Sequence, residues 1–254
     1  MLVHLVTKKE EHQSAVYDNV LHKLDELGVG VVGDIAACDA VVTIGGDGTI
    51  LRAGRGAAMA RKPLLGINTG TLGFMATLET DELDKLARLK TADYSISRRM
   101  ALSVECLQES HLALNDVVLH RAATARLPEF TVLRGDTEVL KIRADGMIAA
   151  SPTGSTAYSL SAGGPMIEPE LECFLLTAVC PHTLFNRPMI FSPESRLRIC
   201  TNNVSVIVDG NMVAEYTENS TVTVTKSAHY LDLIDIDGNS FYNSIHNKLM
   251  KPLK

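Results

Sequence analysis

The pattern of apolar residues changes near residue 95, and this change restricts the possible folds more than any other feature of the 254-residue chain. Before it, short apolar runs alternate with segments in which apolar residues recur every three or four positions, as on one face of a helix. This alternation predicts a mostly parallel, doubly wound, Rossmann-like α/β sheet. Gly28 is expected to end the first helix and Thr80 to cap the third. The expected strands are residues 2–6, 40–44 and 63–67, and the expected helices are residues 10–27, 49–60 and 81–89.

After residue 95 the sequence follows a strand pattern. Short apolar segments recur at regular spacing with turn sequences between them, which is typical of an antiparallel, sandwich-like β domain. Three dipeptides are candidates for turns: Gly135-Asp136, Asn202-Asn203 and Asp209-Gly210. The expected strands are residues 102–106, 130–133, 139–142, 196–200, 204–208, 222–225 and 231–236.

The last residues return to a helical pattern, because Phe241, Ile245 and Leu249 share one helical face. Such a tail can pack back on the first domain. We therefore expect an α/β domain of residues 1–95 joined by the tail 237–254, and a β-rich domain of residues 96–236.

Composition narrows the functional classes. Hydrophobic residues make up 46% of the chain and charged residues 21%, which is ordinary for a soluble globular protein. No apolar run approaches the roughly 20 residues that span a bilayer. The five cysteines form no CxxC pair, so neither a disulfide framework nor a structural metal site is expected, and the predicted compartment is the reducing cytoplasm. The net charge of −6 disfavours nucleic acid as a partner.

Residues 28–33 match the GxGxxG pattern of dinucleotide-binding proteins. That fingerprint binds pyrophosphate only where it follows a strand and opens a helix, because the helix N-terminus must face the phosphates. Here it follows an expected helix and leads into a strand. We interpret it as a helix cap and a connection, which disfavours a Rossmann dehydrogenase.

The first candidate site is Gly45-Gly46-Asp47-Gly48-Thr49, directly after an expected buried strand. Ligands of open α/β sheets bind at this carboxyl edge. The glycines can bring bare N–H groups close to a ligand, and the following helix directs its positive end to the same place. The four residues around Asp47 are therefore expected to form the loop for a phosphate donor.

An acidic side chain in a phosphate-binding loop suggests a functional role, because the charge of Asp47 would otherwise only repel the phosphate. It could take a proton from an attacking hydroxyl or hold Mg²⁺. Asp-Gly is also a common turn sequence, so a purely structural role stays open. The same five-residue loop occurs in kinases of unlike substrates, and alone it indicates only a kinase-like activity.

A longer candidate stretch spans residues 145–165. Beyond Ser151, six side chains up to Ser161 carry hydroxyl groups, and the small residues among them let the backbone approach a ligand. The hydroxyls can satisfy ribose oxygens and an amide, and the ring of Tyr158 can stack on a base. A polar turn alone poorly explains a stretch of this length.

With these motifs the chain closely resembles the NAD kinase family over nearly its whole length. The resemblance implies transfer of a phosphoryl group from ATP, or from polyphosphate, to the 2′-hydroxyl of the adenosine ribose of NAD, with Mg²⁺ or another divalent cation carried by the donor. It also implies a dinucleotide site between the two domains and assembly into a homodimer or homotetramer. The motifs that carry it are residues 45–49, 65–74, 114–116, 145–165, 181–188 and 209–210.

Position by position, the resemblance assigns roles to individual residues. Asp47 would be the catalytic base that removes the 2′-hydroxyl proton. Asn115 and Asp116 would hydrogen-bond the dinucleotide, and Asp145 would contact its nicotinamide end. The other residues implied in NAD binding are Gly48, Phe74, Arg126, Arg143, Thr156, Ala157, Tyr158, Ser159, Leu160, Ser161 and Asn211.

One departure from the family pattern is Phe185, which stands where a small polar residue is usual. Two other interpretations remain open from the residues alone. A lipid or sugar kinase would explain Asp47 but leaves residues 145–165 without a purpose. A non-catalytic NAD-sensing module would explain those residues but leaves Asp47 without one.

Overall fold

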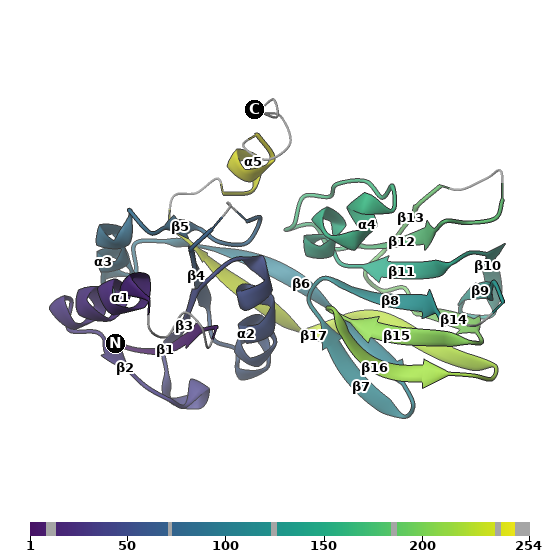
Figure 1. Ribbon diagram of the computed structural model, residues 1–254, viewed down its shortest axis with the longest axis horizontal. Helices are drawn as coiled ribbons and strands as arrows, with labels where there is room; N and C mark the ends of the chain where they lie inside the picture. The colour runs from purple at the N-terminus through teal and green to yellow at the C-terminus, as the bar shows by residue number, and fades with distance from the viewer. Residues whose placement is uncertain (9–13, 71–72, 123–125, 184–186, 237–239, 247–254) are drawn as a thin grey trace. The chain divides into compact units, whose positions relative to one another are not determined.

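The computed structural model describes residues 1–8, 14–70, 73–122, 126–183, 187–236 and 240–246. The chain divides into two compact units, a first unit of Met1–Arg98 with His229–Lys254 and a second unit of Arg99–Ala228 (Figure 1). The sequence placed the two boundaries after residues 95 and 236. The second boundary falls instead inside one long strand, β17 (Ser220–Asp235), where no turn sequence marks it.

The sheet of the first unit is parallel, as predicted, and its strands lie in the order β2-β1-β3-β4, with β5 and the end of β17 both paired to β4. Every residue of β3 and β4 is buried, which is expected for strands covered on both faces. The strands are β1 (Leu2–Thr7), β2 (Gly30–Val31), β3 (Ala40–Ile44), β4 (Leu64–Asn68) and β5 (Leu78–Glu79).

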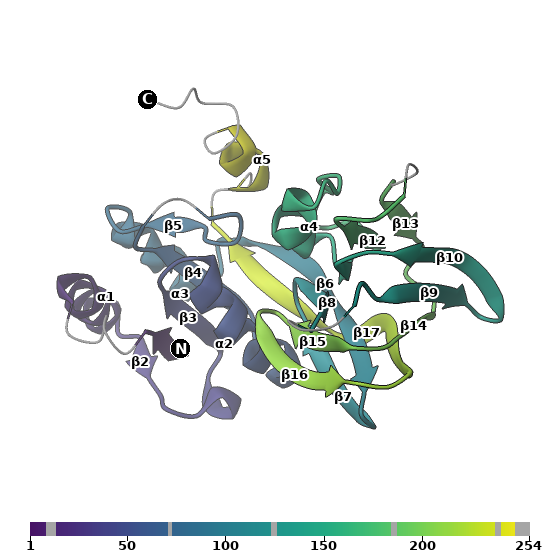
Figure 2. The same ribbon diagram turned by 45° about the vertical axis from the view of Figure 1, so that its right-hand side comes forward.

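Helices cover the two faces of this sheet. Helix α1 (Ala15–Glu26) lies on one side and α2 (Asp47–Ala60) on the other (Figure 2). Val20 and Leu24 of α1 belong to the same buried cluster as the strand residues, and Ile50 of α2 packs against the backbone of β4 from the opposite side. The fold therefore buries the sheet between helices and leaves its carboxyl edge for loops.

Helix α1 begins at a serine cap and ends before a glycine. Ser14 caps the helix, because its Oγ accepts a hydrogen bond from the Tyr17 N–H at 3.2 Å. Residues 10–13 of the predicted helix lie outside the described residues. Gly28 has φ of +65°, which confirms the predicted glycine after the helix. The GxGxxG residues 28–33 follow α1, as predicted, but they contain β2 instead of preceding a strand.

The predicted helix at 81–89 is present with shifted limits, but its predicted cap is wrong. The segment forms a 3-10 helix, η3 (Leu83–Leu86), followed by the short α3 (Ala87–Thr91), and Thr80 does not cap either. Glu82 stands at the N-cap position without a side-chain cap bond, and its carboxylate instead accepts the Glu79 N–H at 3.1 Å and pairs with Lys85 at 2.6 Å.

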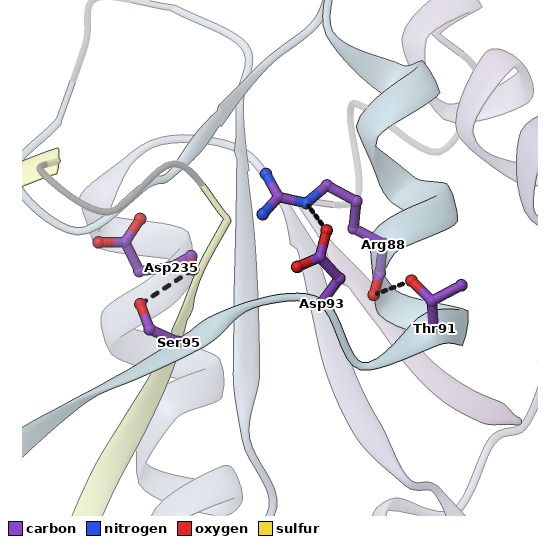
Figure 3. A network of polar contacts seen from close by, with 5 residues as sticks. All are labelled: Arg88, Thr91, Asp93, Ser95 and Asp235. Atoms are coloured by element: carbon purple, nitrogen blue, oxygen red, sulfur yellow. Dashed lines mark hydrogen bonds and ion pairs between the residues drawn. The ribbon is translucent and has the colours of Figure 1, made fainter.

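Polar contacts fix the exit from α3 (Figure 3). Arg88 Nε donates to Asp93 Oδ2 at 2.9 Å, and Thr91 Oγ1 donates to the Arg88 carbonyl at 3.3 Å. Ser95 Oγ then donates to the backbone carbonyl of Asp235 at 3.3 Å. The last bond ties the strand that leaves the first unit to the strand that returns to it.

The second unit is built from antiparallel strands, as predicted. One sheet has the order β13-β12-β11-β8-β15-β16, and in the other β10, β9, β14 and β17 are neighbours. Fully buried Phe130 and Phe174 contribute to the core of this unit. The strands are β6 (Ser95–Cys106), β7 (Glu109–Ala113), β8 (Asp116–Arg121), β9 (Glu129–Arg134), β10 (Thr137–Arg143), β11 (Gly146–Ala150), β12 (Phe174–Val179), β13 (Met189–Phe191), β14 (Leu197–Thr201), β15 (Val204–Val208) and β16 (Asn211–Tyr216).

The predicted turns have different outcomes. Gly135 joins the paired strands β9 and β10, and Asp209-Gly210 joins β15 and β16 with φ of +46° and +79°, the left-handed values of a type I′ turn. Asn202-Asn203 is not a hairpin turn, because β14 and β15 belong to different sheets. The predicted strands 222–225 and 231–236 are two parts of the single strand β17.

A short helix, α5 (Ser240–Ile245), follows β17 and belongs to the first unit. Phe241 and Ile245 are half-buried on it, and Leu249, the third residue of the predicted face, lies outside the described residues. Among the described residues, no helix combines the length and the apolar character needed to cross a membrane.

Candidate active site

Asp47 stands at the carboxyl edge of the parallel sheet. Strand β3 ends at Ile44, and after Gly45 and Gly46 the chain enters α2, of which Asp47 is the first residue. The strand order reverses between β1 and β3, and open α/β sheets bind ligands at this kind of switch point. The first turn of α2 also provides unpaired N–H groups and the positive end of the helix dipole. The loop is therefore suited to a phosphate, as predicted from the sequence.

The carboxylate of Asp47 is held by the backbone of a second loop. The Phe74 N–H donates to Oδ2 at 2.9 Å and the Met75 N–H donates to Oδ1 at 3.1 Å. Gly73 lies so close that a Cβ added there would be 1.8 Å from Oδ1. Motifs at 45–49 and 73–75 thus form one rigid cluster around a half-buried carboxylate, a relationship that the sequence does not reveal.

The glycines of the loop have different tasks. Gly45 has φ of +144°, and an added Cβ would be 2.4 Å from Thr49 Oγ1, so only glycine fits there. Nothing lies within 4 Å of a Cβ built on Gly46 or on Gly48. The loop is therefore closed on its inner side by Thr49 and has room for a ligand at Gly46 and Gly48.

In the second unit, the carboxylate of Asp209 organises the corner at Asn115 and Asp116. Its Oδ1 accepts the N–H groups of Asn115 and Asp116 at 2.8 and 3.2 Å, and its Oδ2 accepts the Leu114 N–H at 2.9 Å. The sequence indicates for Asp209 only a turn and a family motif. Its positive φ of 46°, together with these three bonds, makes it the anchor of the predicted dinucleotide contacts.

Asp116 itself is buried, with 6% of its surface exposed. Loss of hydration on burial, and then the nearby charge of Asp209, raise the pKa of Asp116 to about 7. Next to it, Asn115 Oδ1 is buried and has no hydrogen-bond partner within the described part of the chain. This corner therefore has polar groups whose bonding is incomplete without a ligand.

The stretch after β11 packs its backbone against Asn115. The Ser151 N–H donates to the Asn115 carbonyl at 2.8 Å, and a Cβ added to Gly154 would be 2.1 Å from that carbonyl oxygen. Ser151 Oγ donates to the Leu114 carbonyl and accepts the Gly154 N–H. The two motifs that the sequence assigned to NAD binding, 114–116 and 151–161, are therefore adjacent.

Three of the seven hydroxyl side chains from Ser151 to Ser161 point inward. Ser151, Ser155 and Ser159 recur every fourth residue and are fully buried. Ser155 Oγ bonds the backbone of Ile167, and Ser159 Oγ lies 3.0 Å from Thr177 Oγ1. The expectation that all these hydroxyls face a ligand is thus too broad, and Ser159 is placed where it supports the loop. The spacing of four was the signal that could have separated the two groups.

The outward side of the same segment holds the remaining predicted contacts. The segment itself is made of the 3-10 helix η4 (Thr153–Thr156) and the short helix α4 (Tyr158–Ser161). Tyr158 is 39% exposed and Ser161 is exposed, while Thr156, Ala157 and Leu160 are half-buried. Thr156 Oγ1 donates to the Thr153 carbonyl at 3.2 Å.

Three charged residues of the second unit were also predicted to contact NAD: Asp145, Arg126 and Arg143. Asp145 pairs with Arg121 at 3.2 Å, a partner that the sequence did not indicate because nothing in it shows that β8 lies beside β11. Arg126 and Arg143 are exposed, and the Arg143 carbonyl accepts the His182 N–H at 2.7 Å.

Asn211, the last predicted NAD contact, lies at a hairpin turn. Asn211 Nδ2 donates to the Asp209 carbonyl at 3.1 Å, inside the β15–β16 turn. Phe185, the departure noted from the sequence, lies outside the described residues.

A carboxylate fixed at a helix N-terminus beside open glycines is suited to phosphoryl transfer, because the helix end and the glycine N–H groups can bind phosphate. Residues 3–93 match the family of ATP-NAD kinase N-terminal domains, and residues 114–236 match that of ATP-NAD kinase C-terminal domains. The chain belongs to the NAD kinase family, and its activity is that of an NAD kinase.

Individual relatives agree with this assignment. The NAD kinase of Clostridium perfringens is 34% identical over 270 residues, covering 97% of each chain. Among solved structures, yeast NADH kinase complexed with NADH has a TM-score of 0.86 at 25% identity, covering 100% of this chain and 89% of its own. An NAD kinase from Archaeoglobus fulgidus in complex with ATP has a TM-score of 0.84 at 27% identity, with 96% of each chain covered. These likenesses do not favour a lipid kinase or a sensing module.

Proposed function

We propose that the chain transfers the γ-phosphoryl group of ATP to the 2′-hydroxyl of the adenosine ribose of NAD, with Asp47 as the general base. The observation that carries this proposal is the position of the Asp47 carboxylate, which two backbone N–H groups hold at the N-terminus of α2. The complex of the Archaeoglobus fulgidus relative with ATP supports ATP as the donor.

In this mechanism the carboxylate of Asp47 takes the proton of the 2′-hydroxyl while the ribose oxygen attacks the γ-phosphorus. The bond from that phosphorus to the bridging oxygen breaks, and ADP leaves. Phosphoryl transfer depends mainly on positioning and on neutralising charge, so a base with a single fixed orientation is an advantage. The N–H groups of Gly46 and Gly48, at the open side of the loop, would hold the donor phosphates.

The second unit would supply the contacts to NAD. Asp116, whose carboxyl is buried beside the Asp209 anchor, is suited to accept bonds from ribose hydroxyls. Asn115 Oδ1 is a buried acceptor without a partner in the described residues, and a donor on the ligand would satisfy it. The exposed Tyr158 ring can stack on a base, and exposed Arg143 can meet phosphate.

Mg²⁺ is the cation we propose for the reaction. No three His, Cys, Asp or Glu side chains cluster as metal ligands within the described ranges. Mg²⁺ in kinases is typically held largely by substrate phosphates, so the ion would be carried by the donor phosphates, for which the loop has room at Gly46 and Gly48, while the Asp47 carboxylate acts as the base. When bound, the ion would offset charge on the donor phosphates.

We also propose a homodimeric or homotetrameric assembly in the cytoplasm. The assembly is what the resemblance to the NAD kinase family implies. All five cysteines are free thiols, which suits a reducing compartment. Light scattering on the purified protein would give the assembly size.

The test is NADP formation from NAD, ATP and Mg²⁺ by the wild type and by Asp47→Asn. We expect the variant to bind NAD as the wild type does but to lose roughly 10²- to 10⁴-fold in kcat, the usual contribution of a general base. Thermal unfolding checks that the fold survives, because the new amide faces two N–H donors. A near-normal kcat in Asp47→Asn would remove the base assignment, and a parallel arm with polyphosphate identifies the donor.

A further inference from the structure

The short helix α5 contacts the loop that holds Asp47. Ser244 is 1% exposed, and its Oγ donates to the Gly73 carbonyl at 2.8 Å. On the same helix, the Phe241 ring lies 6.3 Å from the Phe74 ring, centre to centre. Helix α5 thus contacts the 73–75 loop through the Ser244 hydrogen bond and the Phe241–Phe74 ring contact.

The two hydrogen bonds at this loop belong to one peptide group. The Gly73 carbonyl, which accepts from Ser244, and the Phe74 N–H, which donates to Asp47 Oδ2 at 2.9 Å, are its two ends. A peptide group is planar, so its carbonyl and N–H turn together. Hydrogen bonds in such a chain also polarise and strengthen each other. A bond at one end therefore fixes the direction of the donor at the other.

The glycine at position 73 makes it necessary to hold this peptide group in one orientation. Gly73 has no Cβ, because any Cβ there would collide with the carboxylate of Asp47, and a peptide group beside glycine rotates more freely than one between larger residues. Without the Ser244 bond, rotation of the Gly73–Phe74 peptide would withdraw one of the two donors from Asp47.

We propose that Ser244 is a positioning residue for phosphoryl transfer, holding the Gly73–Phe74 peptide group so that its N–H orients the carboxylate of Asp47. This inference rests on the proposed role of Asp47 as the base. It gives the C-terminal segment a part in the reaction, although α5 is distant in sequence from every motif that the family resemblance uses.

The experiment compares steady-state kinetics and thermal unfolding of Ser244→Ala and Ser244→Cys with those of the wild type. Cysteine fills the space of the hydroxyl but is a weak donor, so it separates packing from hydrogen bonding. We expect kcat to fall roughly 10- to 100-fold in both variants, as for small misplacements of reacting groups, with KM values for NAD and ATP unchanged. The exposed His246→Ala, just beyond the same helix, is the matched control and should keep wild-type kcat.

A double-mutant cycle with Asp47→Asn decides the role. If Ser244 acts through the Asp47 carboxylate, Ser244→Ala should lower the residual rate of Asp47→Asn by less than twofold, because coupled residues are not additive. Wild-type kcat in Ser244→Ala or in Ser244→Cys, or an equal loss in both backgrounds, would overturn the inference. A fully active Asp47→Asn would instead overturn the proposed function, so the two failures are distinguishable.

Discussion

Gly73 and Asp47 are in direct contact, with the carboxylate of Asp47 occupying the place where any other residue at position 73 would carry its Cβ. The distance from that Cβ position to Asp47 Oδ1 would be 1.8 Å. The two residues come from different sequence motifs, one after β3 and one after β4, so the parallel sheet is what brings them together. A substitution at Gly73 must therefore act on the carboxylate.

We expect Gly73→Ala to lower kcat by about 10²-fold or more, because the carboxylate must leave its two N–H donors to make room, and small misplacements at a reacting group have effects of this size. The measurement is NADP formation under saturating NAD and ATP. Gly70→Ala is the control on the same segment, since nothing lies within 4 Å of a Cβ there, and it should retain activity. Equal activities of the two variants would contradict the rigid Asp47 cluster.

A second prediction concerns stability and pH. Burial, and then the charge of Asp209, raise the pKa of Asp116 to about 7, whereas an unfolded aspartate keeps its ordinary value of 3.8. Between these values the folded state binds the proton more tightly than the unfolded state, so the contribution of Asp116 to stability falls as pH rises from about 4 to about 7. The full difference is on the order of a few kcal/mol.

Asp116→Asn cannot ionise and should remove that pH dependence. The Tm of the variant minus the Tm of the wild type should therefore rise from about pH 4 to about pH 7 and stay level above it. Calorimetry across this range without ligand is the measurement. A difference that is constant with pH would show that the Asp116 carboxyl is ionised normally in the folded protein.

A third prediction separates the two groups of hydroxyls. Ser159→Ala should destabilise the protein by about 1–2 kcal/mol, because it removes the buried partner of Thr177, while the KM for NAD stays close to that of the wild type. Ser161→Ala, at an exposed position two residues along, should raise the KM for NAD and leave the unfolding free energy unchanged. A raised KM for NAD in Ser159→Ala, with an unchanged unfolding free energy, would show that Ser159 faces the ligand.

Much of the fold was accessible from the sequence because burial imposes local patterns. Strand β3 has the predicted limits, and the glycine loop follows it as expected. The errors have specific physical causes. Asn202-Asn203 has the chemistry of a hairpin turn, but pairing between strands is non-local, and the flanking strands belong to different sheets. Lys226 and Ser227 interrupt the apolar pattern, although the backbone of β17 continues through them.

The candidate site was also predictable only in part. The residue types that carry chemistry were recognisable, because Asp47 and the stretch after Ser151 stand out against ordinary loops. The contacts that orient them were not, since the bonds from Phe74 and Met75 to Asp47 and from Asp209 to the 114–116 corner use backbone N–H groups. Every residue except proline has such a group, so sequence letters do not reveal which one will be used.

The first unit is discontinuous in sequence, because its strand β4 pairs with residues of β17, including Leu64 with Leu233. During synthesis this sheet therefore stays incomplete at one edge until the whole second unit has left the ribosome. For the same reason, exchanging the first unit with that of a relative requires two crossovers, near residues 98 and 229. A chimera made with one crossover would combine a β4 from one parent with a β17 from the other.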